Sequence, residues 1–416
     1  MTETVGRWDT AYEWKAVTLL SLAFGLVGLD RWIITPLFPS IMKDLHLDYG
    51  QIGALAGILA VCWGGAAILM GGVADRIGRR KVMIPAIVIF SLLSGLSGVA
   101  ASFGMLMLLR GVMGCTEGAF TPASVAASAE ASRPERRGLN QGFQLSLFAL
   151  LGLGLGPIIA TQLLKVVPSW RYVFMLVAIP GFILAILMYF VIREPSREMA
   201  AAHAHGGRWI DAVRNHNVIV SIVGVLCAMC GIFVIGAMMP SYLIDFLKLT
   251  PPQMGFVMSA IGFGGFLGEF VVPGLSDYLG RKTMAIAAFI GGAILLKLFQ
   301  MTGADPMTLF LLLFFVGFCC MGLLSLFTGP VPTEAVNPVL IASAIGLVSG
   351  TGEIFGGGIA PVIGGWIAQH NGIQHVLDLA LGGLLAGIVV SLFIKESAPR
   401  KLAAAALKVS GAPRQA

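Results

Sequence analysis

Residues Gly71 to Val82 read GGVADRIGRRKV, and residues Pro273 to Met284, 202 positions later, read PGLSDYLGRKTM. In both places the segment follows a long apolar stretch. The residues that recur at equivalent positions are Gly72 and Gly274, Asp75 and Asp277, Gly78 and Gly280, and Arg79 and Arg281. One architectural unit is therefore present twice in the chain.

The composition indicates that this chain is solvated by lipid. Of its 416 residues, 57% are hydrophobic and 12% are charged, which is too little charge to cover a soluble globule of this length. Apolar runs of roughly 20 residues, the length that crosses the hydrocarbon core, follow one another almost continuously. An open sheet cannot satisfy its backbone in hydrocarbon, and the alternating units of a membrane barrel do not occur. We therefore predict an all-α membrane protein.

The apolar runs predict twelve transmembrane helices, over residues 14–38, 50–73, 82–103, 105–129, 138–163, 169–192, 216–242, 252–275, 283–303, 306–330, 338–368 and 373–395. Basic residues gather in the loops on one side, as in Arg76 to Lys81 and Arg133 to Arg137. By the positive-inside rule, both termini are cytoplasmic. The net charge of +6 is thus a topology signal, and no nucleic-acid partner is predicted.

The repeat divides the chain into two pseudo-symmetric six-helix bundles. We expect an N-terminal half over residues 1–192, a cytoplasmic linker over 193–215, a C-terminal half over 216–396 and a cytoplasmic tail over 397–416. Such repeats place a substrate site near the membrane midplane, between halves that open it alternately to either side. The organisation is that of a transporter.

The segment GGVADRIGRRK resembles the loop motif of the major facilitator superfamily, and GLSDYLGRK stands where the second half of that family carries it. Arg110, Gly111 and Gly114 resemble a second motif of the superfamily. The resemblance covers nearly the whole chain. It implies the major facilitator fold, and a latch that holds the cytoplasmic side closed in the outward-facing state.

Elementary chemistry is consistent with such a latch. Glycines permit close packing and a tight turn, and Asp75 can face the positive N-terminal end of a neighbouring helix. Arg79 or Arg80 can pair with Glu130 at the cytoplasmic end of the fourth span. The predicted gating residues are Gly72, Asp75, Gly78, Arg79, Arg80, Glu130, Asp277 and Arg281. The alternative is that these charges only set the topology.

A closer resemblance rests on charges inside the spans. Asp30 and Arg31 lie together in the first span, and Arg110 and Glu117 lie seven residues apart in the fourth. This arrangement is similar to that of the anion:cation symporter family. The resemblance implies transport of an organic anion together with a cation.

Placing a charged side chain inside a membrane span costs at least about 2.5 kcal/mol of insertion free energy, so such side chains normally face a cavity and a partner. Arginine forks match carboxylates, so we predict that Arg31 and Arg110 bind substrate. Asp30 and Glu117 can gain and lose protons, and we assign them to proton coupling. The alternative is that Asp30 only neutralises Arg110, which would leave Glu117 unpaired.

The second half contributes fewer candidates. Glu353 is either a further proton-coupling acid or a cap for a break in its glycine-rich helix. Glu269 is assigned to gating or packing. The glycines and proline of residues 152–157 resemble a motif of antiporters in the superfamily, and we interpret them as a bend.

We therefore predict an inner-membrane symporter that imports a small organic anion, such as a sugar acid or an aromatic acid, with protons. A functional monomer without cofactor or metal is expected. Drug:proton antiport is the second hypothesis, and a transporter-like receptor is a third. No clustered nucleophile, base or nucleotide-binding loop occurs, so an enzyme is not predicted.

Overall fold

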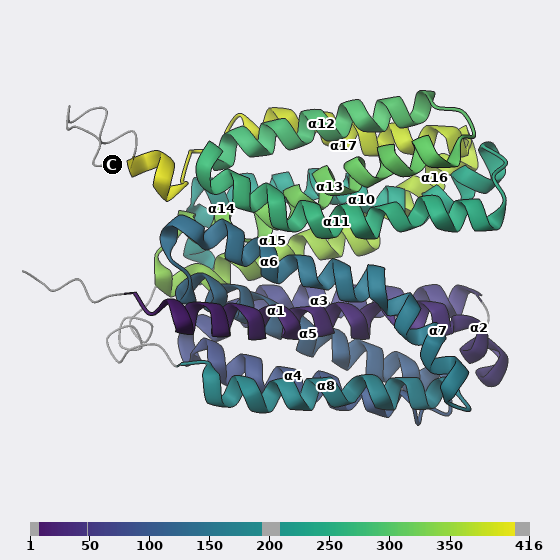
Figure 1. Cartoon of the computed structure of the whole chain (residues 1–416), viewed down its shortest axis with the longest axis horizontal. Helices are drawn as coiled ribbons and strands as arrows, with labels where there is room; N and C mark the ends of the chain where they lie inside the picture. Colours follow the sequence, from purple (N-terminus) through teal and green to yellow (C-terminus); the bar gives the residue numbers. More distant parts are fainter. Residues whose placement is uncertain (1–7, 48, 194–208, 404–416) are drawn as a thin grey trace, which may run out of the picture.

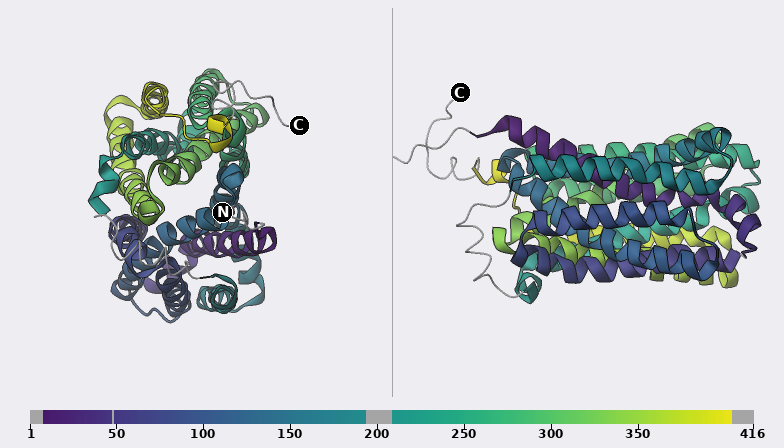
Figure 2. Two further views of the ribbon diagram at one scale, coloured as in Figure 1. Left: turned by 90° about the vertical axis from the view of Figure 1, so that its left-hand side faces the viewer. Right: turned by 90° about the horizontal axis from the view of Figure 1, so that it is seen from below.

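The computed structural model describes residues 8–47, 49–193 and 209–403, and these residues form helices, turns and loops without a strand. The helices run side by side in an elongated bundle (Figure 1). The first and last described residues lie at the same end of this bundle, which we call the terminal end (Figures 1 and 2). Most of the predicted linker and tail, residues 194–208 and 404–416, lies outside the described residues.

The first bundle packs around one hydrophobic core, formed mainly by residues 16–192. Its main elements are α1 (Thr10–Trp32), α2 (Ile34–Leu45), α3 (Tyr49–Ile77), α4 (Arg79–Ser97), α5 (Phe103–Ala131), η1 (Pro134–Arg136), α6 (Arg137–Phe148), η2 (Ala149–Leu155), α7 (Gly156–Val166) and α8 (Trp170–Val191).

The second bundle has a separate core, formed mainly by residues 212–394. Its main elements are α10 (His216–Ser241), η4 (Tyr242–Phe246), α11 (Pro251–Leu279), α12 (Arg281–Met301), α13 (Pro306–Thr328), α14 (Pro330–Ala335), α15 (Ile341–Ile354), η6 (Phe355–Ile359), α16 (Ala360–Asn371) and α17 (Val376–Ser391). End-on, the helices of the two bundles form two groups (Figure 2). Helices α6 and α15 lie where these groups meet (Figure 1).

Ten helices of the described chain are long and apolar enough to cross a membrane, and eleven if the bent pair around η2 counts as one span. On this criterion, eleven of the twelve predicted spans qualify among the described residues. The helix that does not qualify is α5, although its 29 residues exceed the necessary length. Arg110 and Glu117 lower its apolar character, and both are buried inside the protein.

The predicted bend in the fifth span is present as a π-helix. Element η2 interrupts the span between α6 and α7, and η6 interrupts α15 and α16 at the corresponding place of the second bundle. Gly28 of α1 allows close contact here, because a Cβ atom at this position would lie 2.9 Å from the Cα atom of Phe148. The irregular segment therefore packs directly against the helix that carries Asp30 and Arg31.

We expect Gly28→Ala to lower the free energy of unfolding by about 1–3 kcal/mol, because the added methyl group overpacks the α1–η2 contact. Thermal unfolding of the purified protein in detergent measures the change. Gly104→Ala is the matched control, since a Cβ atom there meets nothing within 4 Å. Equal midpoints for the two variants would contradict the packing argument.

Candidate substrate site and inter-bundle latches

Arg31 and Glu353 form an ion pair that joins the two bundles. Arg31 is the penultimate residue of α1, and Glu353 is the penultimate residue of α15. The Nη2 atom of Arg31 donates to Oε1 of Glu353, and the two side chains are only 11% and 6% exposed. The sequence marked both residues as candidates but did not predict that they meet.

Arg110 of α5 lies against Asp30 of α1, as the sequence suggested, but through the main chain. Its Nη1 atom donates to the backbone carbonyl oxygen of Asp30 at 3.1 Å. The Asp30 carboxylate instead accepts a hydrogen bond from Ser94 Oγ of α4 at 2.9 Å. Sequence reasoning missed Ser94, because a serine in an apolar helix carries no distinctive signal.

We call Arg31, Glu353, Asp30, Arg110 and Glu117 the charged cluster. Several of its buried charged atoms lack a hydrogen-bond partner among the described residues. They are Asp30 Oδ2, Arg110 Nε, Arg110 Nη2, and Glu117 Oε1 and Oε2. A buried polar atom left without a partner costs about 1–3 kcal/mol, and more when it is charged. Unpaired groups of this kind are rare in ordinary cores and are typical of sites that take up a ligand or an ion.

The cluster contains two cations and three acids: the pair of Arg31 and Glu353 joins the bundles, whereas Asp30 and Arg110 contact residues of the first bundle. Arg110 and Glu117 lie two turns apart on one face of α5, or roughly 10 Å along the axis. The guanidinium of Arg110 also lies over the ring of Phe174, 5.7 Å from its centroid. Chemically, the arginines can hold carboxylates and the acids can exchange protons.

The first repeat makes a set of contacts at the terminal end that we call the first latch, after the predicted role. The Nη1 atom of Arg79 lies 2.7 Å from Asp75 Oδ1, and its Nη2 atom lies 2.9 Å from Glu130 Oε1. This confirms the predicted pairing of Arg79 with Glu130. Arg79 Nη2 also donates to the carbonyl oxygen of Pro338, in the second bundle, at 3.1 Å.

Asp75 faces the start of a helix in the other bundle. Its carboxylate accepts from the backbone N–H of Ala342 at 3.1 Å and of Ser343 at 2.6 Å, the second and third residues of α15. It also accepts from the Ser343 hydroxyl. The predicted contact between Asp75 and a positive helix end is therefore present, and it crosses from one bundle to the other.

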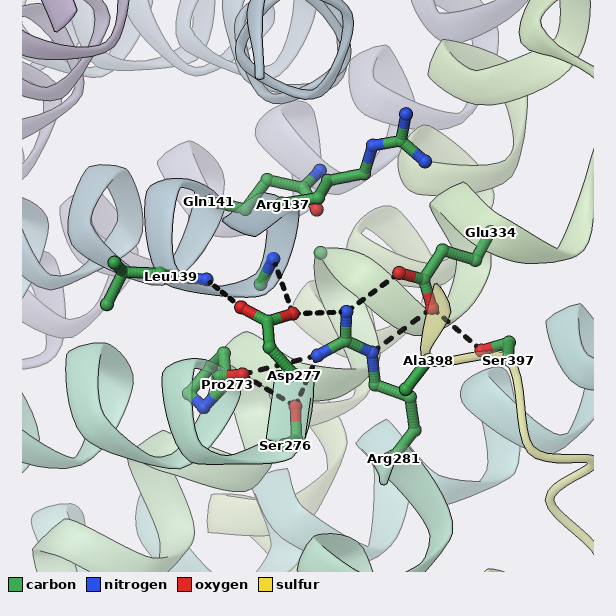
Figure 3. A network of polar contacts seen from close by, with 12 residues as sticks. Arg137, Leu139, Gln141, Pro273, Ser276, Asp277, Arg281, Glu334, Ser397 and Ala398 are labelled. Atoms are coloured by element: carbon green, nitrogen blue, oxygen red, sulfur yellow. Dashed lines mark hydrogen bonds and ion pairs between the residues drawn. The ribbon is translucent and has the colours of Figure 1, made fainter. Parts of the chain in front are cut away.

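The second repeat forms the reciprocal latch (Figure 3). Asp277 accepts from the backbone N–H of Gly138 at 3.1 Å and of Leu139 at 2.9 Å, the second and third residues of α6. The guanidinium of Arg281 lies between Asp277 and Glu334, with Nη2 contacts of 2.6 and 2.7 Å. Each bundle thus caps a helix of the other.

The sequence did not identify Glu334 as a latch residue. A signal was available, because Glu334 follows Arg281 by 53 residues and Glu130 follows Arg79 by nearly the same interval. Ser397 Oγ also donates to Glu334, at 2.8 Å (Figure 3).

Glycine has a defined role in both repeats. Gly78 and Gly280 adopt φ values of 103° and 101°, which disfavour any residue with a side chain, and each precedes the first residue of the next helix. The close inter-bundle approach occurs at Gly71, beside the buried Gly72.

Arg80 does not join the latch. It donates to the Tyr189 carbonyl oxygen at 2.5 Å and lies over the Tyr189 ring.

The sequence model of the Major Facilitator Superfamily matches residues 20–222 and 221–415. The chain belongs to this superfamily. A probable 4-methylmuconolactone transporter of Cupriavidus pinatubonensis is 26% identical over 85% of this chain and 83% of its own length. The cis,cis-muconate transport protein of Acinetobacter baylyi is 27% identical over 93% of this chain and 95% of its own.

The solved structure of the proton:xylose symporter XylE has the same fold. It superposes with a TM-score of 0.75 at 17% sequence identity, covering 94% of this chain and 97% of the symporter. The facilitator described here is therefore a multi-pass membrane transporter, and its relatives include proteins named as transporters of cis,cis-muconate and 4-methylmuconolactone.

We expect Asp277→Asn to open the terminal end more often, because it removes a charge-assisted contact with α6 worth about 1.5–3 kcal/mol. A water-soluble maleimide should then label a cysteine at Gln141, a residue buried beside Thr333 of the second bundle, roughly tenfold faster in detergent. Labelling of the same protein without the Gln141→Cys change supplies the background.

Asp305→Asn is the control for this experiment. Asp305 also caps a helix, α13, and the hydrogen bonds from Thr308 hold the pKa of this carboxyl below its usual value. Asp305 and the helix that it caps both lie in the second bundle, so Asp305→Asn should not change the rate at which the cysteine at position 141 is labelled. An equal acceleration by the two substitutions would show that general destabilisation, rather than the latch, controls access.

Proposed function

We propose that this facilitator imports a small organic anion together with protons by alternating access. The observation that carries the proposal is the cluster of Arg31, Arg110, Asp30, Glu117 and Glu353, in which the ion pair of Arg31 with Glu353 joins the two bundles. Unpaired buried charges at this place are costly for packing alone and are accounted for by ligand and proton binding. The names of the relatives support an organic acid as cargo.

The membrane arrangement is part of the proposal. Helix α5 is a further span, because its 29 residues are long enough to cross a membrane and its Arg110 and Glu117 are buried inside the protein. The terminal end is cytoplasmic, since the basic loops of the repeats lie there. The transporter then consists of halves 1–192 and 216–396, acts as a monomer and resides in the inner membrane.

Substrate binding begins with an exchange of carboxylates. The substrate carboxylate takes the place of Glu353 on the Arg31 fork, and the unpartnered Nη2 atom of Arg110 offers a further donor. Glu353 is released from its ion pair in this step and becomes available to a proton. The exchange removes a direct contact between α1 and α15, which links substrate binding to movement of the bundles.

Protons bind at Glu117 and Asp30. Both Glu117 oxygens and one Asp30 oxygen have no hydrogen-bond partner among the described residues. Protonation neutralises these carboxyls and so lowers the cost of enclosing them with a bound anion. The inward proton gradient then drives accumulation.

Drug:proton antiport is the alternative, and the glycines and proline of residues 152–157, which resemble a motif of antiporters, favour it. In that case the buried acids would recognise a cation. The direction in which a pH gradient drives carboxylate or cation transport distinguishes the two functions.

We expect proteoliposomes containing the protein to accumulate at least one of cis,cis-muconate, D-glucuronate and benzoate, and only with an inward proton gradient. Arg110→Gln should reduce this uptake on the order of a hundredfold, since it removes a buried carboxylate partner. Lys297→Gln, which changes an exposed cation, is the control. Absence of uptake for every anion tested would refute anion import.

Glu117→Gln should retain exchange of labelled for unlabelled substrate but lose accumulation driven by the pH gradient. The amide mimics the protonated acid, so binding persists while proton release does not occur. Substrate exchange and gradient-driven uptake are measured on the same vesicles, with the exposed Glu135→Gln as control. Wild-type accumulation by Glu117→Gln would exclude this residue as the coupling acid.

A further inference from the structure

Glu269 is a buried carboxyl group that the site described above does not use. It lies on α11, eight residues or about 12 Å before the latch residue Asp277. The residue is 4% exposed, and its Oε2 atom has no hydrogen-bond partner among the described residues. The residue belongs to the part of α11 that packs against α6 of the first bundle, as its backbone carbonyl oxygen shows.

Helix α6 of the first bundle packs closely on α11 at this point. A Cβ atom at Gly142 would lie 2.6 Å from the carbonyl oxygen of Glu269. Phe143 and Phe270 contact each other beside it, with ring centroids 5.8 Å apart. The seam between α6 and α11 is thus closed by backbone contact and aromatic packing.

An equivalent seam lies between α15 of the second bundle and α3 of the first. There Gly346 packs against the carbonyl oxygen of Ala67. Ala67 precedes Glu269 by 202 positions, the interval that separates the two repeats. The seam between α15 and α3 therefore packs closely with the methyl group of Ala67 at this position. A carboxyl group such as that of Glu269 is not required for the packing.

No basic side chain of the described chain compensates Glu269. The neighbouring elements carry their charged or titratable residues near their ends: Glu135 and Arg136 of η1, Arg137 of α6, His216 of α10, Asp245 of η4, and Arg281, Lys282 and Lys297 of α12. Helix α13 carries the thiols Cys319 and Cys320 but no charged residue, and η2 has neither charged nor titratable residues. Helix α10 also carries Cys227 and Cys230, and η4 carries Tyr242. Among the described residues, Glu269 forms no ion pair, and Arg281 is already held by Asp277 and Glu334.

We propose that Glu269 is a proton-binding site of the gate, protonated while α6 and α11 are in contact and deprotonated when they separate. A charged carboxylate in the closed seam would have neither water nor a counter-ion, so the closed seam favours the neutral acid. Separation of the helices admits water and favours the anion. Proton binding therefore stabilises closure of the terminal end, and a rise in pH opens it.

This inference rests on the alternating movement of the bundles in the proposed function, but not on the substrate. It is tested without substrate on the full chain in lipid nanodiscs, with spin labels at Lys81→Cys and Thr283→Cys. These exposed residues occupy equivalent positions at the starts of α4 and α12, one in each bundle. The exposed native Cys115 is replaced by serine.

Pulsed electron paramagnetic resonance measures the distance between the labels as the pH is raised. The wild-type protein should gain a population with a longer distance at high pH. Glu269→Gln, and Glu269→Ala, which copies the first repeat, should keep the short distance throughout. Glu135→Gln, an exposed acid at the same end, should respond as the wild type does.

Three results would overturn the proposal: a wild-type distance that does not change with pH, a response that survives in both Glu269 variants, or an equal loss of response in Glu135→Gln. Anion import is tested separately, because the uptake assay does not depend on this distance. Failure of uptake with a normal pH response would contradict the substrate assignment and leave Glu269 as a gate acid.

Discussion

Two aspartates, one from each repeat, hold the terminal end of this transporter together. Asp75 and Asp277 each accept hydrogen bonds from the second and third residues of a helix in the opposite bundle. The acceptor is charged and the donors stand at the positive end of a helix, so the contact is strong, yet it consists of only a few bonds. A closed state that depends on such a contact can be opened without unfolding either core.

The cost of charge in a low-dielectric environment explains where the other ionisable groups lie. Arg110 and Glu117 occupy α5, a helix that is long enough to cross a membrane but is not among those apolar enough to qualify as a span, and both side chains are buried. Arg31 and Glu353 neutralise each other across the bundles. Arg79 and Arg281 are paired with acids in the contacts between the bundles, whereas Asp30, Glu117 and Glu269 retain unpartnered oxygens and are the groups for which we propose protons.

The repeat and the deviations from it have different roles. Residues that recur, such as Asp75 with Asp277 and Arg79 with Arg281, build the latches. Residues that do not recur, such as Glu269 opposite Ala67, carry the proposed chemistry. This separation is consistent with a fold shared with a proton:xylose symporter at 17% identity, since a common mechanism of movement does not require common cargo residues.

Composition and the repeat were sufficient to predict an all-helical membrane fold, the tight turn at Gly78 and the partner of Arg79. These features follow from local chemistry and from hydrophobic length, which the sequence contains directly. The ion pair of Arg31 with Glu353 and the reciprocal capping of α6 and α15 were decided only by tertiary structure. They join residues more than 130 positions apart, and their formation depends on helix rotation and depth, which periodicity alone does not determine.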